Sequence, residues 1–410
     1  MTVNIFEGAA VMRVLALGGA GEMGRVAARV LHGDDRVTAL TIADRDERAA
    51  RKVAGELGAE ARALDVTDGP SLAAALREAD LVVNTVGPYF RFGPPILAAA
   101  IAAGCDYIDI CDDPQPTADM LELDAEAKAA GVTALLGMGA SPGVANLLAV
   151  RAGAELDRVD SLVTGWNIHS AHTEESAAAT AAVVHGMRQI SGNIPVTRAG
   201  ARVERPALER VRLEYPGLGT GAGRSFGHPE AITLPLAFPG VEDATSVVVA
   251  DRPTSAALLA LRWAMNHRLL TVDRAALSAA RLERLLPADP ATLVAAGGLP
   301  PLFAIAEGER DGSPARAATA LSQVPGLSMA DNTGVPLAVG ALLLAANPRP
   351  GVHAPETLLD PDQFFAAFAS HCLGAPDPAA MTITTRSWAS PDSNAAALSS
   401  ALLTALIAAR

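Results

Sequence analysis

The hydrophobic pattern between residues 13 and 139 repeats in a regular way. Short apolar runs, each the length of a buried strand, are followed by a turn and then by a stretch with the apolar spacing of an amphipathic helix. Strands are predicted at 13–19, 37–46, 60–66, 81–87, 107–111 and 132–139. Helices are predicted at 22–33, 47–58, 68–79, 94–104 and 117–131. This alternation with apolar strands predicts an α/β fold with a doubly wound parallel sheet.

The pattern changes after residue 156. A second set of strands is predicted at 160–168, 210–217, 231–240, 245–250 and 301–310, with helices such as 255–270 between them. A buried helix within 326–348 is expected to return to the first domain, and a strand and a helix follow within 381–390 and 394–410. The expected domains are 12–146 completed by 333–372, a second α/β domain at 147–332, and a C-terminal strand and helix at 375–410.

Length and charge narrow the classes of function. The chain has 410 residues, of which 50% are hydrophobic and 19% charged, and this length favours two domains over one core. The formal net charge of −13 argues against a nucleic-acid partner, because phosphates would be repelled. A small acidic substrate would then need a local arginine pocket. Lys52 and Lys128 are the only lysines, which argues against a lysine base or Schiff base.

Cysteine usage and the terminal segments bear on location. Cys105, Cys111 and Cys372 form no C-x-x-C pair, which fits a reducing compartment and favours neither a disulfide scaffold nor a metal site. The N-terminus lacks a basic segment followed by an apolar one, and the longest apolar run near the C-terminal end is too short to cross a bilayer. A soluble cytoplasmic protein with no membrane partner is expected.

The stretch VLALGGAGEMGRVAARVL carries the strongest chemical signal. Gly19-x-Gly21-x-x-Gly24 is the dinucleotide fingerprint, and Gly18-x-x-Gly21-x-x-Gly24 is the spacing of short-chain dehydrogenases. The stretch follows a predicted strand and opens a predicted helix, and Asp44 lies twenty residues after Gly24, at the end of the next strand. In this context glycines let backbone amides approach a pyrophosphate at a helix N-terminus. A Rossmann domain that binds a dinucleotide is therefore predicted.

Two acidic positions bear on which dinucleotide is bound. Asp44 can accept both ribose hydroxyls of NAD, whereas the adjacent Arg45 can grip the 2′-phosphate of NADP, so NAD is favoured and NADP stays open. Asp65 ends the third predicted strand, where it can contact the adenine amino group or serve as a helix N-terminal acid. The predicted cofactor-binding residues are Gly19, Gly21, Glu22, Met23, Gly24, Asp44, Arg45, Asp65, Val66, Val86 and Gly87.

The short-chain dehydrogenase interpretation requires a second motif, which the sequence lacks. That mechanism needs a Tyr-x-x-x-Lys pair for proton transfer, and the chain has three tyrosines, Tyr89, Tyr107 and Tyr215. The residues four positions after them are Gly93, Cys111 and Gly219. The short-chain mechanism is therefore excluded.

The sequence resembles the saccharopine dehydrogenase-like family of oxidoreductases from residue 14 to about residue 368. The resemblance rests on the order and spacing of GGAGEMG, VVNTVGPYFRFGPPILAAAIAAGCDYIDI, GMGASPGVANLLA, FGHPEAITLP, TGVPLAVGALLLA and GVHAPE. It implies a Rossmann domain completed by a returning segment, and an inserted substrate-binding domain that often builds a homodimer. The implied chemistry is hydride transfer to or from a C–N bond of an amino acid, an opine-like adduct or a polyamine.

The resemblance leaves the subfamily open. The Lys/His catalytic pair of the lysine-forming branch has no matching lysine here, and the tail beyond Gly374 has no place on the family pattern. A carbonyl or enoyl reductase on the same scaffold, and an NAD(H)-binding sensor without turnover, remain alternatives.

Two groups of residues near the predicted strand ends are candidates for chemistry in the first domain. Tyr89 can orient a substrate or relay a proton, or it packs as an aromatic residue at the rim. Asp112 and Asp113 follow the fifth predicted strand, where they can bind a cationic amine or cap the next helix. We assign Tyr89 and Asp112 to catalysis and Asp113 to substrate binding.

The second domain offers arginine and histidine. Arg224 suits a substrate carboxylate through a two-pronged contact, and His228 suits the acid/base partner of a nitrogen atom, although both also fit a turn before a strand. His169 is a candidate for substrate binding or a surface-loop residue. His169 and His172 are spaced for a metal site, but no third ligand has suitable spacing, so no metal is predicted.

Overall fold

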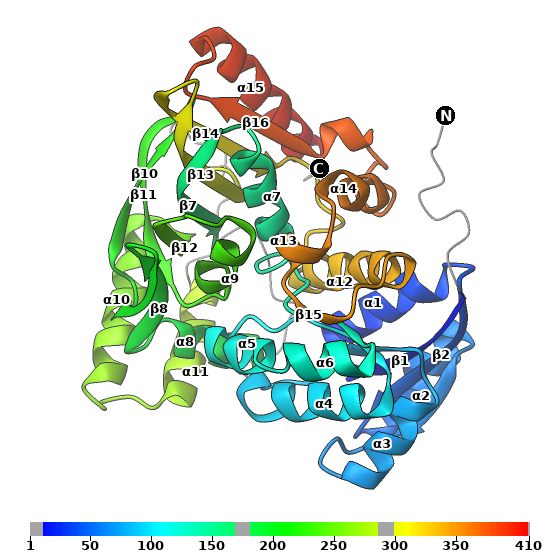
Figure 1. The fold of residues 1–410 in the computed structure, drawn as a ribbon. Coiled ribbons are helices and arrows are strands. Elements are labelled where there is room, and N and C mark those ends of the chain that lie inside the picture. Colours follow the sequence, from blue (N-terminus) through cyan, green and yellow to red (C-terminus); the bar gives the residue numbers. More distant parts are fainter. Residues whose placement is uncertain (1–10, 169–180, 286–298, 409–410) are drawn as a thin grey trace. The chain divides into compact units, whose positions relative to one another are not determined.

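The computed structural model describes residues 11–168, 181–285 and 299–408, in two compact units (Figure 1). The first unit consists of Met1–Leu147 with Ser328–Pro378, and the second consists of Leu148–Leu327 with Ala379–Arg410. His169 and His172 lie outside the described residues.

The first unit contains a seven-stranded parallel sheet in the order β15-β6-β5-β4-β1-β2-β3. The strands are β1 (Met12–Leu17), β2 (Val37–Asp44), β3 (Glu60–Ala63), β4 (Leu81–Asn84), β5 (Asp106–Asp109), β6 (Thr133–Leu135) and β15 (Gly351–His353). The helices are α1 (Glu22–His32), α2 (Glu47–Leu57), α3 (Gly69–Arg77), α4 (Tyr89–Ala103), α5 (Pro114–Leu121), α6 (Asp124–Ala130), α12 (Met329–Ala346), α13 (Pro355–Leu358) and α14 (Pro361–Ala369). The predicted doubly wound α/β fold is confirmed, and the strand order reverses between β1 and β4.

The boundaries of two helices differ from the prediction. Helix α4 begins at Tyr89, five residues before the predicted start, so that Pro94 and Pro95 lie inside it. The Tyr89 hydroxyl donates to the Asn84 carbonyl oxygen at 2.9 Å, which holds the first turn against the end of β4. The helix predicted at 117–131 is split into α5 and α6, which are separated at Glu122 and Leu123.

Helix α12 is the most apolar helix among the described residues. It is long and apolar enough to cross a membrane by length and composition alone, yet 67% of it is buried within the structure. A Cβ at Gly334 would lie 2.7 Å from the Met23 carbonyl oxygen and 2.8 Å from Val26 Cβ, so α12 and α1 pack in close contact. We therefore describe α12 as a core helix of the first unit.

The second unit contains a nine-stranded mixed sheet with the path β10-β11-β12-β7-β13-β14-β16. Strand β8 pairs with both β12 and β9 beside this path. Among the described pairings of this second sheet, only that of β12 with β7 is parallel. The strands are β7 (Arg158–Asn167), β8 (Asn193–Arg198), β9 (Ala201–Pro206), β10 (Arg210–Tyr215), β11 (Gly219–Phe226), β12 (Asp243–Val249), β13 (Leu302–Arg310), β14 (Ser313–Leu321) and β16 (Thr382–Arg386). The remaining helices are α7 (Val144–Gly153), α8 (Ala181–Gln189), α9 (Glu230–Ala237), α10 (Arg252–Asn266), α11 (Val272–Leu285), α15 (Pro391–Ala408) and the short 3-10 turn Pro378–Ala380.

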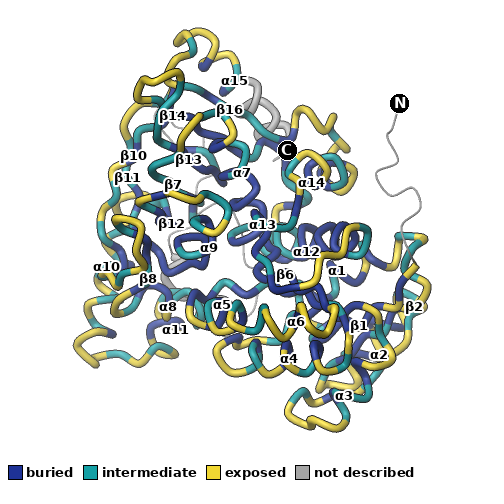
Figure 2. The backbone as a smooth tube through the Cα atoms, in the orientation of Figure 1, coloured by how far each residue is buried: buried dark blue, intermediate teal, exposed yellow. Residues whose placement is uncertain are grey.

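The two faces of the second sheet are buried by different partners. On one face, Trp166, Phe226 and Val248 pack with residues of α8, α10 and α11. On the other face, Val247 and Phe303 belong to a separate apolar cluster. Figure 2 shows the central strands of this sheet as mostly buried and the connecting turns as exposed.

The segment 231–240, predicted as a strand, is mostly helical in α9, so that prediction is wrong. Ala231 and Leu234 are fully buried at helical spacing, and the Thr197 hydroxyl donates to the Ala231 carbonyl oxygen at 2.8 Å. A short apolar run fits a strand or a buried helix equally well, and here the packing against β8 and β12 decides for a helix. The tail strand β16 pairs with β14 and thereby belongs to the sheet of the second unit.

Candidate nucleotide-binding and active site

The turn between β1 and α1 requires glycine at two positions. Gly18 has φ of +71°, in the left-handed region, and its carbonyl oxygen accepts from the Gly21 amide at 2.9 Å. A Cβ at Gly24 would lie 2.4 Å from that same Gly18 oxygen and 2.8 Å from Thr85 Oγ1. The glycines therefore draw the start of α1 onto the end of β1 and onto the residue that follows β4.

The N-terminus of α1 is left open by this turn. Gly21 is the N-cap residue, and no side chain caps the helix. The amides of the first helical turn, at Glu22, Met23 and Gly24, have no partner within the helix and carry the positive end of its dipole. A Cβ at Gly19 would meet the Ala16 carbonyl oxygen at 2.8 Å, so this position is also tight. Such a cradle of backbone amides, which side chains would fill, fits the pyrophosphate of a dinucleotide.

The predicted ribose and adenine contacts lie at the ends of β2 and β3. Asp44 ends β2, and its Oδ1 accepts from the Asp46 amide at 3.1 Å. Arg45 beside it is exposed. Asp65 Oδ1 accepts from the Thr67 hydroxyl at 2.7 Å and from the Thr67 amide at 2.9 Å, and these bonds lower the pKa of Asp65. Each carboxylate keeps its second oxygen clear of these contacts. The roles of these residues stay predictions.

The loop after β4 is anchored by Asn84 and Tyr89. Asn84 Oδ1 accepts from the Val86 amide at 3.0 Å, and Gly87 is exposed. The buried Tyr89 hydroxyl donates to the Asn84 carbonyl oxygen and accepts from the Ile110 amide at 3.3 Å. Burial raises the pKa of Tyr89 well above its usual value. This geometry suits a residue that positions the ends of β4 and β5 better than one that exchanges protons.

A buried polar network that sequence reasoning did not assign to the site lies beside this loop. Asp109 Oδ2 accepts from the Tyr107 hydroxyl at 2.8 Å, and Oδ1 accepts from the amides of Gly137 at 2.7 Å and Cys111 at 3.0 Å. Asn84 Nδ2 donates to the Tyr107 hydroxyl at 2.9 Å. Burial raises the pKa of Asp109 to about 6. The network fixes the ends of β4 and β5 and the turn after β6 relative to one another.

Asp112 and Asp113 follow β5 at the same carboxyl edge of the sheet. Asp112 is half-buried, and its charge contributes to raising the pKa values of Tyr89 and Asp109, after the dominant effect of burial. Asp113 is the buried N-cap residue of α5, but its side chain makes no capping hydrogen bond. Because parallel strands end at one edge, both residues share the edge at which the open turn of α1 lies.

The turn after β11 encloses an imidazole. His228 is 4% exposed, its ring stacks on Trp166 at a centroid distance of 6.2 Å, and the Phe226 ring meets it edge-on at 4.9 Å. His228 Nδ1 lies 3.8 Å from Glu230 Oε2. Arg224, on β11, donates from Nη1 to the Leu208 carbonyl oxygen at 3.0 Å. Arg224 is thus already bonded to the backbone of the sheet.

The predicted site residues fall into three groups. The glycine turn, Tyr89, Asp112 and Asp113 belong to the first unit, and Tyr89 and Asp112 interact electrostatically. Arg224 and His228 belong to the second unit, and His169 lies outside the described residues. Within residues 11–168, 181–285 and 299–408, no group of three or more His, Cys, Asp or Glu side chains could hold a metal ion.

Comparison with known proteins agrees with this geometry. The sequence profile of the saccharopine dehydrogenase NADP binding domain matches residues 14–135. A carboxynorspermidine synthase of Vibrio alginolyticus is 24% identical over 248 residues, which cover 54% of this chain and 59% of that protein. A trans-acting enoyl reductase of Mycobacterium leprae is 28% identical over 132 residues, which cover 31% of this chain and 32% of that protein. The chain thus spans less than two thirds of either relative.

A solved structure shows the same fold. The apo histidine-tagged saccharopine dehydrogenase (L-Glu forming) from Saccharomyces cerevisiae has a TM-score of 0.59 with 18% sequence identity, and the match covers 88% of this chain and 96% of that chain. The resemblance drawn from the motifs is confirmed by these matches, and the open turn of α1 lies within the segment that matches the NADP binding domain profile.

Proposed function

We propose, on the premise that residues 14–135 belong to the saccharopine dehydrogenase NADP binding domain family, that the chain is an NAD(P)-dependent oxidoreductase. The reaction that we propose is hydride transfer to or from a C–N bond, in an amine or imine of an amino acid, an opine-like adduct or a polyamine. The single observation that carries the proposal is the turn at Gly18–Gly24, where a Cβ at Gly24 would meet backbone at 2.4 Å. Glycine at this position lets α1 pack closely against the end of β1, and the uncapped amides of its first turn can then face a pyrophosphate.

The residues of the first unit hold and orient the reactants in this proposal. The amides of Glu22, Met23 and Gly24 bind the pyrophosphate, and Asp44 accepts from the ribose hydroxyls. When bound, the dinucleotide supplies or accepts the hydride. The Asp109 network keeps the ends of β4 and β5 in register beside it. Asp112 provides the negative charge that attracts a cationic amine.

The residues of the second unit supply the proton and the substrate contact. His228 holds or releases the proton at the substrate nitrogen, which is a common task for histidine near neutral pH. Its stack with Trp166 fixes the plane of the ring. Arg224 contacts a substrate carboxylate with the part of its guanidinium that does not bond Leu208.

We favour NAD over NADP as the cofactor, although the matching family is named for NADP. Asp44 ends β2, where its charge repels a 2′-phosphate and its second oxygen suits a ribose hydroxyl. Arg45 is exposed next to it and can bind the 2′-phosphate when NADP is offered. We also propose a cytoplasmic homodimer, in keeping with the family resemblance and the cysteine content.

Reduction of a C=C bond is the second candidate function. It is favoured by the match to a trans-acting enoyl reductase, which covers 31% of this chain. The match to the carboxynorspermidine synthase covers a larger share of this chain, 54%, and it favours C–N chemistry.

A substrate panel separates the two candidates. NADH and NADPH oxidation are followed with mixtures of keto acids or aldehydes and amines, and with enoyl thioesters in parallel wells. NAD reduction is followed with amino acids and polyamines. We expect turnover with the amine-containing mixtures only. Turnover with enoyl thioesters alone would favour the second candidate, and NADH binding without any turnover would overturn both.

A further inference from the structure

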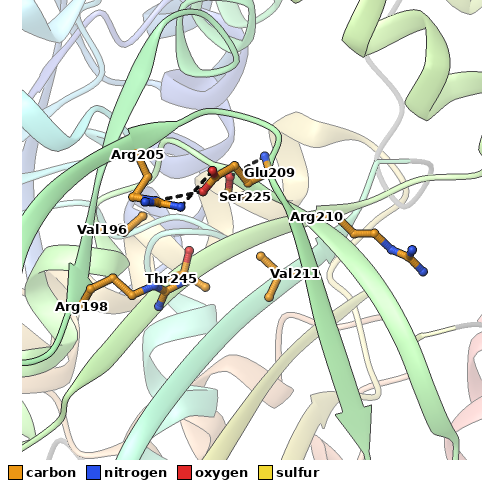
Figure 3. Close-up of a pocket in the computed structure, with 8 residues that line it drawn as sticks. All are labelled: Val196, Arg198, Arg205, Glu209, Arg210, Val211, Ser225 and Thr245. Carbon is orange, nitrogen blue, oxygen red and sulfur yellow. Dashed lines mark hydrogen bonds and ion pairs between the residues drawn. The ribbon is translucent and has the colours of Figure 1, made fainter.

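A pocket of about 440 Å³ lies within the second unit, where the β8–β9 hairpin meets strands β10, β11 and β12 (Figure 3). Its lining residues are Val196, Arg198, Arg205, Glu209, Arg210, Val211, Ser225 and Thr245. Pockets of this size accept a small metabolite. The nucleotide turn belongs to the first unit, so this pocket is a separate feature of the molecule.

Strand register explains how the hairpin lines the pocket. Ile194 pairs with Arg205 and Val196 pairs with Val203, so alternation along the strands places Val196, Arg198 and Arg205 on one face of the hairpin. The hairpin therefore offers one apolar side chain and two guanidinium groups to the same space.

Register also explains the contribution of the main sheet. Ser225 pairs with Val247, and Thr245 and Val211 share the face of Val247. These side chains face the pocket together. Arg210 pairs with Arg224 on the opposite face, and Figure 3 shows its guanidinium extending away from the other lining side chains.

The hydroxyl of Thr245 is the least expected feature of this pocket. Thr245 is 2% exposed, and its Oγ1 is buried with no hydrogen-bond partner in the described parts of the chain. A buried hydroxyl without a partner is rare in folded proteins because it carries a desolvation cost. By contrast, the neighbouring Ser225 hydroxyl accepts from the Glu209 amide at 3.0 Å. The wall of the pocket thus contains a hydroxyl without a partner in the described parts of the chain, but its oxygen is closed to solvent and therefore to a ligand.

The charges around the pocket favour an anion. Arg205 uses Nε and Nη2 to hold Glu209 at 3.1 Å, which leaves its Nη1 hydrogens available. Arg198 is 3.5 Å from Asp243, a long contact between partly exposed side chains that contributes little. In Figure 3, the Arg198 side chain extends toward Thr245. The lining contains three arginines and one carboxylate, in a chain whose formal net charge is −13.

We propose that this pocket binds a small organic anion, with its carboxylate or phosphate group at Arg198 and its carbon skeleton against Val196 and Val211. Arginine suits this role because its planar N–H groups match both carboxylate and phosphate oxygens. The binding site goes beyond the proposed oxidoreductase function and does not depend on it.

Calorimetric titration of the full chain with succinate, citrate and glycerol 3-phosphate tests the proposal. We expect saturable binding of at least one probe, and comparison of the probes separates carboxylate from phosphate recognition. Arg198→Gln should weaken that binding at least about tenfold. Arg212→Gln is the matched control, because Arg212 lies on the same strand β10 but does not line the pocket, and it should leave the affinity unchanged.

Thermal unfolding without ligand checks that both variants are folded. Absence of binding for all three probes, or equal affinities of the Arg198 and Arg212 variants, would overturn the proposal. NADH titration of the same samples reports on the nucleotide site separately.

Discussion

Two turns that follow strands, one in each unit, are built in opposite ways. The turn from Gly18 to Gly24 after β1 is made of backbone, with oxygens and amides so close that a Cβ does not fit. The turn after β11 is made of side chains, with His228 held between Trp166 and Phe226. The first offers amides to a ligand, and the second offers a single imidazole.

This difference shows which kind of functional site can be predicted from an amino-acid sequence. A backbone site leaves a trace in the sequence because only glycine tolerates the close approach, and the glycine spacing follows from helix geometry. A side-chain site leaves none, because Trp166 and His228 meet only through the pairing of β7, β12 and β11. The following variants test this contrast, in order of decreasing expected effect.

Gly24→Val should have the largest effect, because its side chain would enter a space bounded by the Gly18 oxygen at 2.4 Å. We expect NADH affinity to fall about a thousandfold, which corresponds to about 4 kcal/mol. Fluorescence titration with NADH measures this change. Gly55→Ala in α2 is the control, because nothing lies within 4 Å of a Cβ there.

The control variant should keep its NADH affinity and gain about 0.5–1 kcal/mol of stability, since alanine favours a helix more than glycine does. Thermal unfolding checks that Gly24→Val is folded. If folded Gly24→Val binds NADH as the parent protein does, the turn is not a nucleotide site and the backbone half of the comparison fails.

Asp109→Asn tests the network that supports the backbone site. The pKa of Asp109 is raised to about 6 by burial, so the folded protein binds this proton more tightly than the unfolded chain, whose value is near 3.8. The resulting stabilisation is fully present below pH 3.8 and is lost as the pH rises through 6. About two pKa units correspond to about 3 kcal/mol.

We therefore expect the free energy of unfolding of the parent protein to fall by about 3 kcal/mol relative to Asp109→Asn between pH 4 and pH 7. Below pH 4 the variant should be the less stable protein, because the Tyr107 hydroxyl loses its acceptor. Urea unfolding at a series of pH values measures both effects. Parallel stability curves for the two proteins would show that Asp109 does not titrate in this range.

His228→Asn tests the side-chain site. If the imidazole moves a proton at the substrate, kcat should fall about a hundredfold while NADH affinity stays unchanged. His267→Asn is the control, because His267 is exposed at the end of α10 and its ring contacts Trp263. Steady-state kinetics with the best amine-containing mixture measures kcat. Equal kcat values for both variants would remove His228 from the reaction.

The same contrast explains how much of the fold was predictable. Six of the seven strands of the first sheet were predicted, and the short strand β15 was missed. Apolar composition marks the buried parallel strands, as in β4, where all residues are buried. In the second unit, the pattern missed β8, β9, β11 and β14, and it mistook α9 for a strand. The sequence of β11, GTGAGRSF, has few apolar residues. Strand β11 and helix α9 owe their form to neighbours that are distant in sequence.

The individual site residues also divide into those that sequence spacing predicts and those that only three-dimensional packing brings together. The glycines and Asp44 are found by spacing alone, because they lie in consecutive βα units. The Asn84–Tyr107–Asp109 network lay outside the prediction of a site, although an acid within the apolar run YIDIC is a signal of a buried carboxylate. No spacing rule could reveal that Thr245 lacks a hydrogen-bond partner, because that depends on three-dimensional packing.

Asp44→Ser should have the smallest effect. It tests whether a side chain beside the backbone site sets the preference between NADH and NADPH. Loss of the carboxylate removes an acceptor for ribose hydroxyls and a charge that repels a 2′-phosphate, while Arg45 remains. We expect the ratio of NADH to NADPH affinity to fall about tenfold. Asp46→Asn is the matched control, because it removes a nearby charge but retains an oxygen to cap α2. A backbone cradle binds the pyrophosphate of either dinucleotide, so only a side chain can discriminate between them, and an unchanged ratio in Asp44→Ser would assign that discrimination to a residue other than Asp44.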